Sequence, residues 1–172
     1  VYNPKLKRQE VFFDKNYNTI IDLYSYGHDI ETAWLMDRGV EVLGDDHYKE
    51  KMSPITETLA ENVYEVAFDG HSLANECCKG EVNDHRIWWV QAETVIGFLN
   101  EYQKHPQKTK FLEASEAEWE FIKEHVIDKR TGSEWFWEVH PYGSPIADRP
   151  IVEPWKCPYH NGRMCMEVIR RL

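Results

Sequence analysis

Residues 87–102 have the sequence Ile-Trp-Trp-Val-Gln-Ala-Glu-Thr-Val-Ile-Gly-Phe-Leu-Asn-Glu-Tyr. The apolar side chains of this stretch that recur at helical spacing are Ile87, Trp88, Val90, Val95, Ile96, Leu99 and Tyr102. Side chains three and four residues apart share one face of an α-helix, so the pattern predicts a helix. Pro106 cannot continue a helix, and we expect the helix to end before it.

The same periodicity occurs twice on the N-terminal side of this stretch. Apolar residues across 30–43 predict one helix, which should stop near Gly44 because glycine readily takes the left-handed conformation that ends helices. Apolar residues across 52–66 predict a second helix. We expect the chain to enter it around Asp45-Asp46, where an aspartate can cap the first free N–H groups.

Two further helices are predicted on the C-terminal side. Apolar residues between Phe111 and Val126 mark one, with Ser115-Glu116-Ala117-Glu118 as a capping box at its start. Another is expected from about Asn161 to the end of the sequence. The five predicted helices give an all-α fold.

The connections between these helices are long and rich in aromatic residues at alternate junctions. Residues 11–14 are expected to be extended, and residues 134–139 alternate aromatic and polar side chains like a strand. Residues 140–154 contain four prolines and are expected to form a loop. Such a pattern is typical of antiparallel helical hairpins whose loops build a site on one face. It leaves open whether the helices form a bundle or part of a larger toroid.

Composition narrows the class of protein. The 172 residues suffice for one domain with a core, and a formal net charge of −10 argues against a nucleic-acid partner. No apolar run approaches the roughly 20 residues of a membrane span. The four cysteines lack zinc-site spacing, so we expect no metal at these residues and reduced thiols in a cytoplasmic protein. The sequence opens with Val1 rather than Met.

One group of residues suited to proton transfer lies near the start of the first predicted helix. His28, Glu31 and Trp34 are three residues apart, so they lie near one helical face. A helix N-terminus disfavours positive charge, which would leave His28 neutral and available as a base. The plain alternative is a capping histidine above a core tryptophan. A metal site would need a third ligand that the local spacing does not offer.

Two further groups are suited to holding a sugar. Trp89 and Glu93 are four residues apart on one helix, where an indole can cover the apolar face of a sugar and a carboxylate can accept its hydroxyl protons. The alternative is that the tryptophans at 88–89 belong to the core. Trp155 and His160 flank a turn that enters the last helix, and Arg163 follows one turn on. Arg163 could balance an anionic intermediate or pair with an acid.

Three motifs carry a family resemblance. They are Ser-Tyr-Gly-His-Asp-Ile-Glu-Thr-Ala-Trp-Leu at 25–35, Trp-Trp-Val-Gln-Ala-Glu at 88–93, and Trp-Lys-Cys-Pro-Tyr-His-Asn-Gly-Arg-Met-Cys at 155–165. Residues 127–130 and 134–135 add to the match. The sequence resembles the N-acylglucosamine 2-epimerase superfamily and, within it, the cellobiose 2-epimerase group, over essentially the whole chain.

The resemblance implies an (α/α)6 barrel with twelve helices in two rings. Residues 1–172 would be the C-terminal part of this single domain, roughly half of the barrel, with the N-terminal half missing. An arginine and a further histidine that the family draws from that half have no counterpart here. We therefore expect apolar faces that are left exposed, and an isolated chain that is inactive.

The resemblance also implies an activity: reversible inversion at C2 of the reducing-end glucose of β-1,4 disaccharides, without a cofactor. Cellobiose would become 4-O-β-D-glucosyl-D-mannose, and lactose would become epilactose. His28 and His160 match the family's two acid/base histidines, and Glu31 matches the carboxylate that supports the first of them. Trp89 and Trp155 match indoles that stack on the disaccharide, and the remaining pocket residues are matched by Trp34 and Glu93.

The chemistry of C2 explains why two histidines are needed. Ring opening places an aldehyde beside C2, and loss of the C2 proton then gives an enediolate, which Arg163 could stabilise. One histidine removes the proton and the other returns one to the opposite face.

Three other functions compete with this one: an aldose–ketose isomerase, an inverting glycosidase using Glu31 and Glu93, and a non-catalytic glycan-binding module.

Overall fold

Five α-helices form the body of the computed structural model, which describes residues 1–146 and 148–172. They are α1 (Tyr26–Leu43), α2 (Asp46–Ala67), α3 (Trp88–Lys104), α4 (Lys110–Phe121) and α5 (Tyr159–Arg171). A π-helical turn, η1 (Ile122–Val126), extends α4. All five predicted helices are confirmed, and their order along the chain follows the prediction.

Helix α3 lies at the centre of the molecule, in contact with α1, α2, α4 and α5. Thirteen of its 17 residues are buried, so the helix is covered on nearly all sides. Gly97 lets α1 approach closely, because a Cβ at this position would collide with the side chain of Ile30. The backbone contact between α1 and α3 therefore depends on the absence of a side chain.

The helix ends agree with the sequence signals in three cases, one of which is the end of α3 at Lys104, before Pro106, and differ in one. Gly44 ends α1 in the left-handed conformation (φ 68°), and the Asp45 side chain caps α2 by accepting a hydrogen bond from the His47 N–H. The predicted capping box at residues 115–118 is wrong, because α4 begins at Lys110. Ser115 lies inside the helix, and its hydroxyl donates to the Val95 carbonyl of α3 at 2.9 Å.

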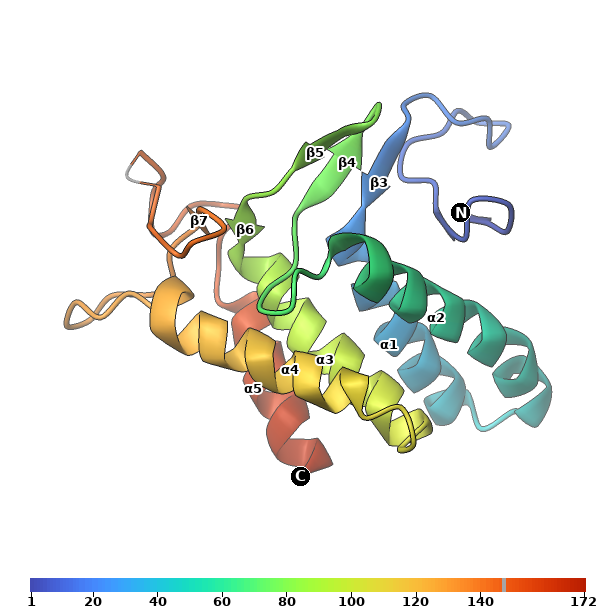
Figure 1. Ribbon diagram of the computed structural model, residues 1–172. Coiled ribbons are helices and arrows are strands. Elements are labelled where there is room, and N and C mark those ends of the chain that lie inside the picture. The colour runs from blue at the N-terminus through green and yellow to red at the C-terminus, as the bar shows by residue number, and fades with distance from the viewer. Residues whose placement is uncertain (147) are drawn as a thin grey trace.

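Short strands occupy the end of the molecule at which α1, α3 and α5 begin (Figure 1). They form three antiparallel sheets: β1 (Tyr2–Asn3) with β2 (Arg8–Gln9), β3 (Leu23–Ser25) with β4 (Glu76–Cys78) and β5 (Glu81–Asn83), and β6 (Arg86–Ile87) with β7 (Glu138–Val139). The predicted strand at 134–139 is reduced to β7. The predicted extended segment at 11–14 contains one isolated bridge, between Phe13 and Thr19.

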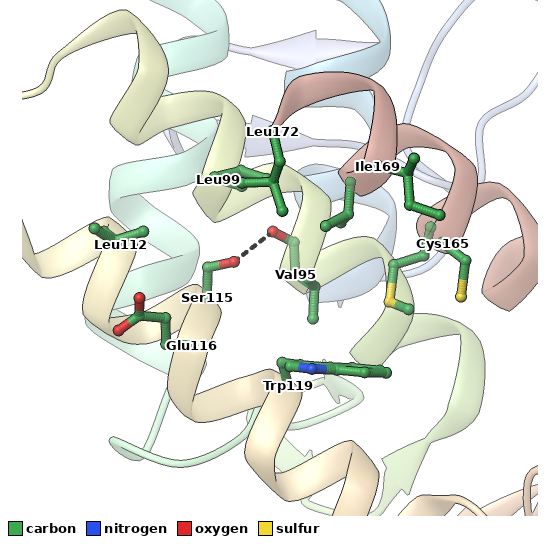
Figure 2. Close-up of a pocket in the computed structure, with 11 residues that line it drawn as sticks. Val95, Leu99, Leu112, Ser115, Glu116, Trp119, Cys165, Ile169 and Leu172 are labelled. Atoms are coloured by element: carbon green, nitrogen blue, oxygen red, sulfur yellow. Dashed lines mark hydrogen bonds between the residues drawn. The ribbon is translucent and has the colours of Figure 1, made fainter.

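An apolar groove of about 390 Å³ runs between α3, α4 and α5 (Figure 2). Val95, Trp119 and Ile169 line it, and Ile169 and Leu172 are largely exposed. The expected exposure of apolar helix faces is therefore confirmed. All four cysteines are free thiols, as predicted. Among the described residues, no helix combines the length and apolar character needed to cross a bilayer.

Candidate active site

The first turns of α1, α3 and α5 surround a pocket of about 430 Å³ at the strand-covered end of the molecule. Five residues expected to bind or transform a sugar line it: His28, Glu31, Trp89, Trp155 and His160. They come from three helices and one loop that are far apart in the sequence. The structure thus brings together the candidate residues of all three motifs.

Both candidate histidines pack against one indole. The ring centroid of Trp89 is 4.9 Å from that of His28 and 5.4 Å from that of His160. Gly27 makes this arrangement possible, because a Cβ there would lie 2.6 Å from the Trp89 ring. The close packing of α1 against α3 therefore brings the indole next to His28.

A buried carboxylate holds His160. Glu93 has no exposed surface, and its Oε1 lies 2.7 Å from Nδ1 of His160. Trp34 Nε1 donates to Oε2 of the same carboxylate at 2.8 Å. Because a carboxylate accepts, the arrangement assigns the proton to Nδ1 of His160 and leaves Nε2 as the atom that can exchange protons with a bound molecule.

Arg163 supplies the positive charge beneath the pocket. One of its nitrogens, Nη2, donates to Glu31 at 2.5 Å and to Glu93 at 2.6 Å. Burial alone would lower its pKa, but the hydrogen bonds to Glu93 and Glu31 raise the pKa of the guanidinium above its usual value. The guanidinium also lies over the Trp34 and Tyr159 rings, at 5.0 and 4.5 Å from their centroids.

Two groups of acidic residues and histidine in the described chain have the compactness of a metal site. The first consists of Glu31, Glu93 and His160, whose ligand atoms lie within 4.8 Å of one another. Arg163 already bridges its two carboxylates. The positive charge that a metal ion would bring to these carboxylates is therefore already supplied by the guanidinium.

The second compact group, Glu57, Glu101 and His105, lies on α2 and at the end of α3. Lys108 is 2.5 Å from Glu57, and Lys104 is 3.3 Å from Glu101. Lysine ammonium groups thus neutralise the carboxylates of this group. The arrangement is an ion-pair network that ties α2 to α3.

Three predicted binding residues lie beneath the pocket surface. The side chain of Trp34 is only 2% exposed, and Glu93 is fully buried, so neither offers surface to a ligand in this structure. Arg163 is partly buried and is engaged with the two carboxylates. Trp155, by contrast, is 83% exposed at the pocket rim.

Glu134 holds both the loop that carries Trp155 and the start of α5, which carries His160. The Lys156 ammonium and the Asn161 amide both donate to the Glu134 carboxylate. Lys156 is only 1% exposed, and its ammonium lies 5.4 Å from the Trp88 ring centroid. Lys156 therefore anchors this segment and does not line the pocket.

The pocket also contains residues that the sequence did not single out. Asn75 and Glu76 reach it from β4 and the residue before it, because Glu76 pairs with Ser25 in the sheet. Trp137 also lines the pocket, with its ring centroid 4.7 Å from that of Trp88. Their approach depends on long-range strand pairing, for which the local sequence carries no signal.

Comparison with known proteins gives consistent matches along the chain. A cellobiose 2-epimerase from Ruminococcus albus is 49% identical over 171 residues, covering 99% of this chain and 44% of that protein. The crystal structure of a sugar epimerase from a ruminal bacterium superposes with a TM-score of 0.96, at 48% identity, over 99% of this chain and 44% of that one. The cellobiose 2-epimerase structure from Bacillus thermoamylovorans B4167 gives 0.91 at 43% identity, over 100% and 44%.

These matches confirm the expected architecture, since the matched structures are (α/α)6 barrels of which this chain covers less than half. The chain spans about 44% of the length of the relatives from Ruminococcus albus and Dictyoglomus turgidum. The model of the family described as N-acylglucosamine 2-epimerase matches residues 8–161. This range contains the first two motifs in full and the third as far as residue 161. With this match and relatives of nearly 50% identity, the chain belongs to the N-acylglucosamine 2-epimerase family.

Proposed function

We propose that this chain carries the two proton-transferring residues of a carbohydrate 2-epimerase. The substrates would be β-1,4 disaccharides with glucose at the reducing end, such as cellobiose and lactose. The observation that carries the proposal is the placement of two histidines around one indole in a single pocket, with one of them held by a buried carboxylate. The named relatives support the epimerase activity.

The reaction would proceed through the open-chain sugar. One histidine takes the C2 proton, and the electrons of the broken C–H bond move into the C1 carbonyl to give an enediolate. Rotation of the intermediate then presents its opposite face, and the second histidine donates a proton to C2. Each imidazole must be able to act as both acid and base, which histidine does near neutral pH.

Glu93 would position His160 rather than touch the sugar. Its carboxylate is buried and accepts from Trp34, His160 and Arg163, so the ring of His160 is fixed through Nδ1. Arg163 donates from Nη2 to both carboxylates and from Nη1 to the Tyr159 hydroxyl. We therefore assign Arg163 to holding this network, in place of direct contact with the enediolate.

Glu31 and the two indoles would bind the sugar. Glu31 lines the pocket and shares only Oε1 with Arg163, which leaves its second oxygen to accept from a hydroxyl. Trp89 lines the pocket next to both histidines, and the exposed Trp155 can stack on a sugar face at the rim. These contacts would orient the disaccharide so that C2 lies between the two imidazoles.

The remaining length of the relatives would complete the barrel and the pocket. The apolar groove between α3, α4 and α5 exposes helix surface of the kind that neighbouring helices cover. In this chain the pocket is lined by residues of α1, α3, α5 and the segments next to them. We therefore place epimerase activity in a longer polypeptide that contains this chain.

The separation of the carboxylates disfavours an inverting glycosidase. That mechanism needs two carboxyl groups about 6.5–9.5 Å apart, with room for water between them. Oxygens of Glu31 and Glu93 instead meet at a single guanidinium nitrogen. A glycosidase would also leave His28 and His160 without a role.

Proton NMR of cellobiose in D2O, with the full-length polypeptide to which this chain belongs, tests the proposal. We expect loss of the C2 proton signal together with new mannose-type anomeric signals. A ketose product would favour the isomerase. Intact C2 protons with no new sugar would refute proton transfer and leave a glycan-binding module as the better account.

A further inference from the structure

Ser25 stands at the N-cap of α1 but does not cap it. An N-cap serine normally accepts a hydrogen bond from a backbone N–H of the first turn. Ser25 has the extended backbone of an N-cap residue, yet within the described chain its side chain accepts none of these bonds. The first turn of α1 therefore lacks a stabilising contact that its sequence could provide.

The hydroxyl is directed to His28 instead. Ser25 Oγ lies 2.6 Å from Nδ1 of His28, three residues further along the chain. Ser25 is buried, whereas His28 is exposed to the pocket. The pairing of Ser25 with Glu76 between β3 and β4 fixes the backbone from which the hydroxyl projects. A bond at Nδ1 leaves Nε2 of His28 as the nitrogen free to act in the pocket.

We propose that Ser25 is a positioning residue for His28, and that it gives up helix capping to hold the imidazole by Nδ1. This inference rests on the proposed function, because it concerns the work of His28 in proton transfer. A hydroxyl can donate to a bare Nδ1 and accept from a protonated one. The same bond therefore persists through both protonation states that an acid/base histidine must visit.

The two histidines thus have different partners. Nδ1 of His160 faces a carboxylate, which can only accept, whereas Nδ1 of His28 faces a hydroxyl, which can also donate. Local rules of helix capping are commonly broken at functional sites. The cap of α2 is the matched control, because Asp45 accepts from the His47 N–H in the usual way.

The first test is nitrogen-15 NMR of the imidazoles in the chain itself, which needs no activity. In Ser25→Ala we expect the Nδ1 and Nε2 shifts of His28 to move toward a mixture of tautomers, while those of His160 stay unchanged. Ser25→Thr keeps a hydroxyl and should restore the original shifts. Unchanged His28 shifts in Ser25→Ala would overturn the inference, whatever the outcome of the epimerase assay.

The second test measures kinetics and stability of the full-length polypeptide. Ser25→Ala should lower kcat about tenfold, the effect of losing one hydrogen bond in the transition state, with little change in KM. Its urea midpoint should fall less than that of Asp45→Ala, which loses a true cap. Ser25→Thr should recover most of kcat and the shape of the pH–rate profile. An equal loss of stability in Ser25→Ala and Asp45→Ala, with kcat retained, would mean that Ser25 is only a structural residue.

Discussion

Replacing Asp29 with asparagine should change how the stability of the protein depends on pH. Asp29 lies in the first turn of α1, is 1% exposed, and accepts from the backbone and side chain of Gln9 through Oδ1. Its Oδ2 is buried without a hydrogen-bond partner among the described residues. Burial raises the pKa of this carboxyl from 3.8 to about 7, against the lowering effect of the Gln9 hydrogen bonds.

The sign follows from the raised pKa. The folded protein keeps a proton on Asp29 that the unfolded chain releases above pH 3.8, so the stabilising contribution is complete below that pH. It is lost as the pH rises through about 7. The whole shift corresponds to about 4 kcal/mol, of which about 3 kcal/mol falls between pH 5 and pH 8. Carboxyls with lowered pKa, such as Asp69 and Asp128, act at more acidic pH.

Urea denaturation at pH 5 and pH 8 measures the effect. Asp29→Asn keeps an acceptor for Gln9 but has no proton to lose, so its stability relative to the unchanged protein should improve by about 3 kcal/mol over this interval. Asp46→Asn removes an exposed carboxyl of α2 and is the control. Its free energy of unfolding should differ from that of the unsubstituted protein by the same amount at pH 5 and at pH 8. A constant difference for Asp29→Asn as well would refute the reasoning from burial.

Four further predictions concern the site and its support. His28→Asn or His160→Asn in the full-length polypeptide should lower kcat by roughly 10²–10⁴-fold with KM nearly unchanged; strong loss of binding with turnover retained would contradict the proposed roles. Trp155→Ala should raise KM about fivefold, in line with a stacking contribution of about 1 kcal/mol, and a change confined to kcat would speak against stacking. Glu134→Ala should destabilise the protein by about 3–5 kcal/mol, measured by urea unfolding, because Lys156 is left buried without its ion-pair partner. Adding Lys156→Met to this variant removes the unpaired charge and should restore part of the lost stability. Finally, the isolated 172-residue chain should show no epimerase activity in the cellobiose assay, and recovery of activity by it would contradict the need for the remaining length.

The helices could be predicted because their causes are local. The apolar spacing in residues 87–102 marks α3, and Gly44 and Asp45 mark the end of α1 and the start of α2. The start of α4 could not be predicted from its apparent capping box. Phe111 is fully buried, so packing extends the helix ahead of Ser115, whose hydroxyl bonds to a neighbouring helix instead.

In the candidate site, too, the residues with local sequence signals could be predicted and those placed by long-range packing could not. Residue types and motifs identified the histidines and the indoles that line the pocket. They left open whether Trp34 belongs to the core and did not reveal that Glu93 is buried, because the depth of a side chain depends on which helices meet above it. Asn75 and Glu76 were missed for a related reason, since they arrive through the pairing of β4 with β3, about 50 residues away along the chain.

The arrangement around Glu93 explains why the motifs of three distant segments occur together. Trp34 of α1 and Arg163 of α5 both donate to this one buried carboxylate of α3, and His160 of α5 is held by it. Loss of Arg163 would leave this buried carboxylate without its charged partner, and loss of Trp34 would leave one of its oxygens without a donor. These contacts therefore hold the three helices in one register. That register also sets Trp89, one turn before Glu93, beside both His28 and His160. The group that fixes the helix packing is therefore the group that aligns the two imidazoles, and damage to either role should appear in both stability and turnover.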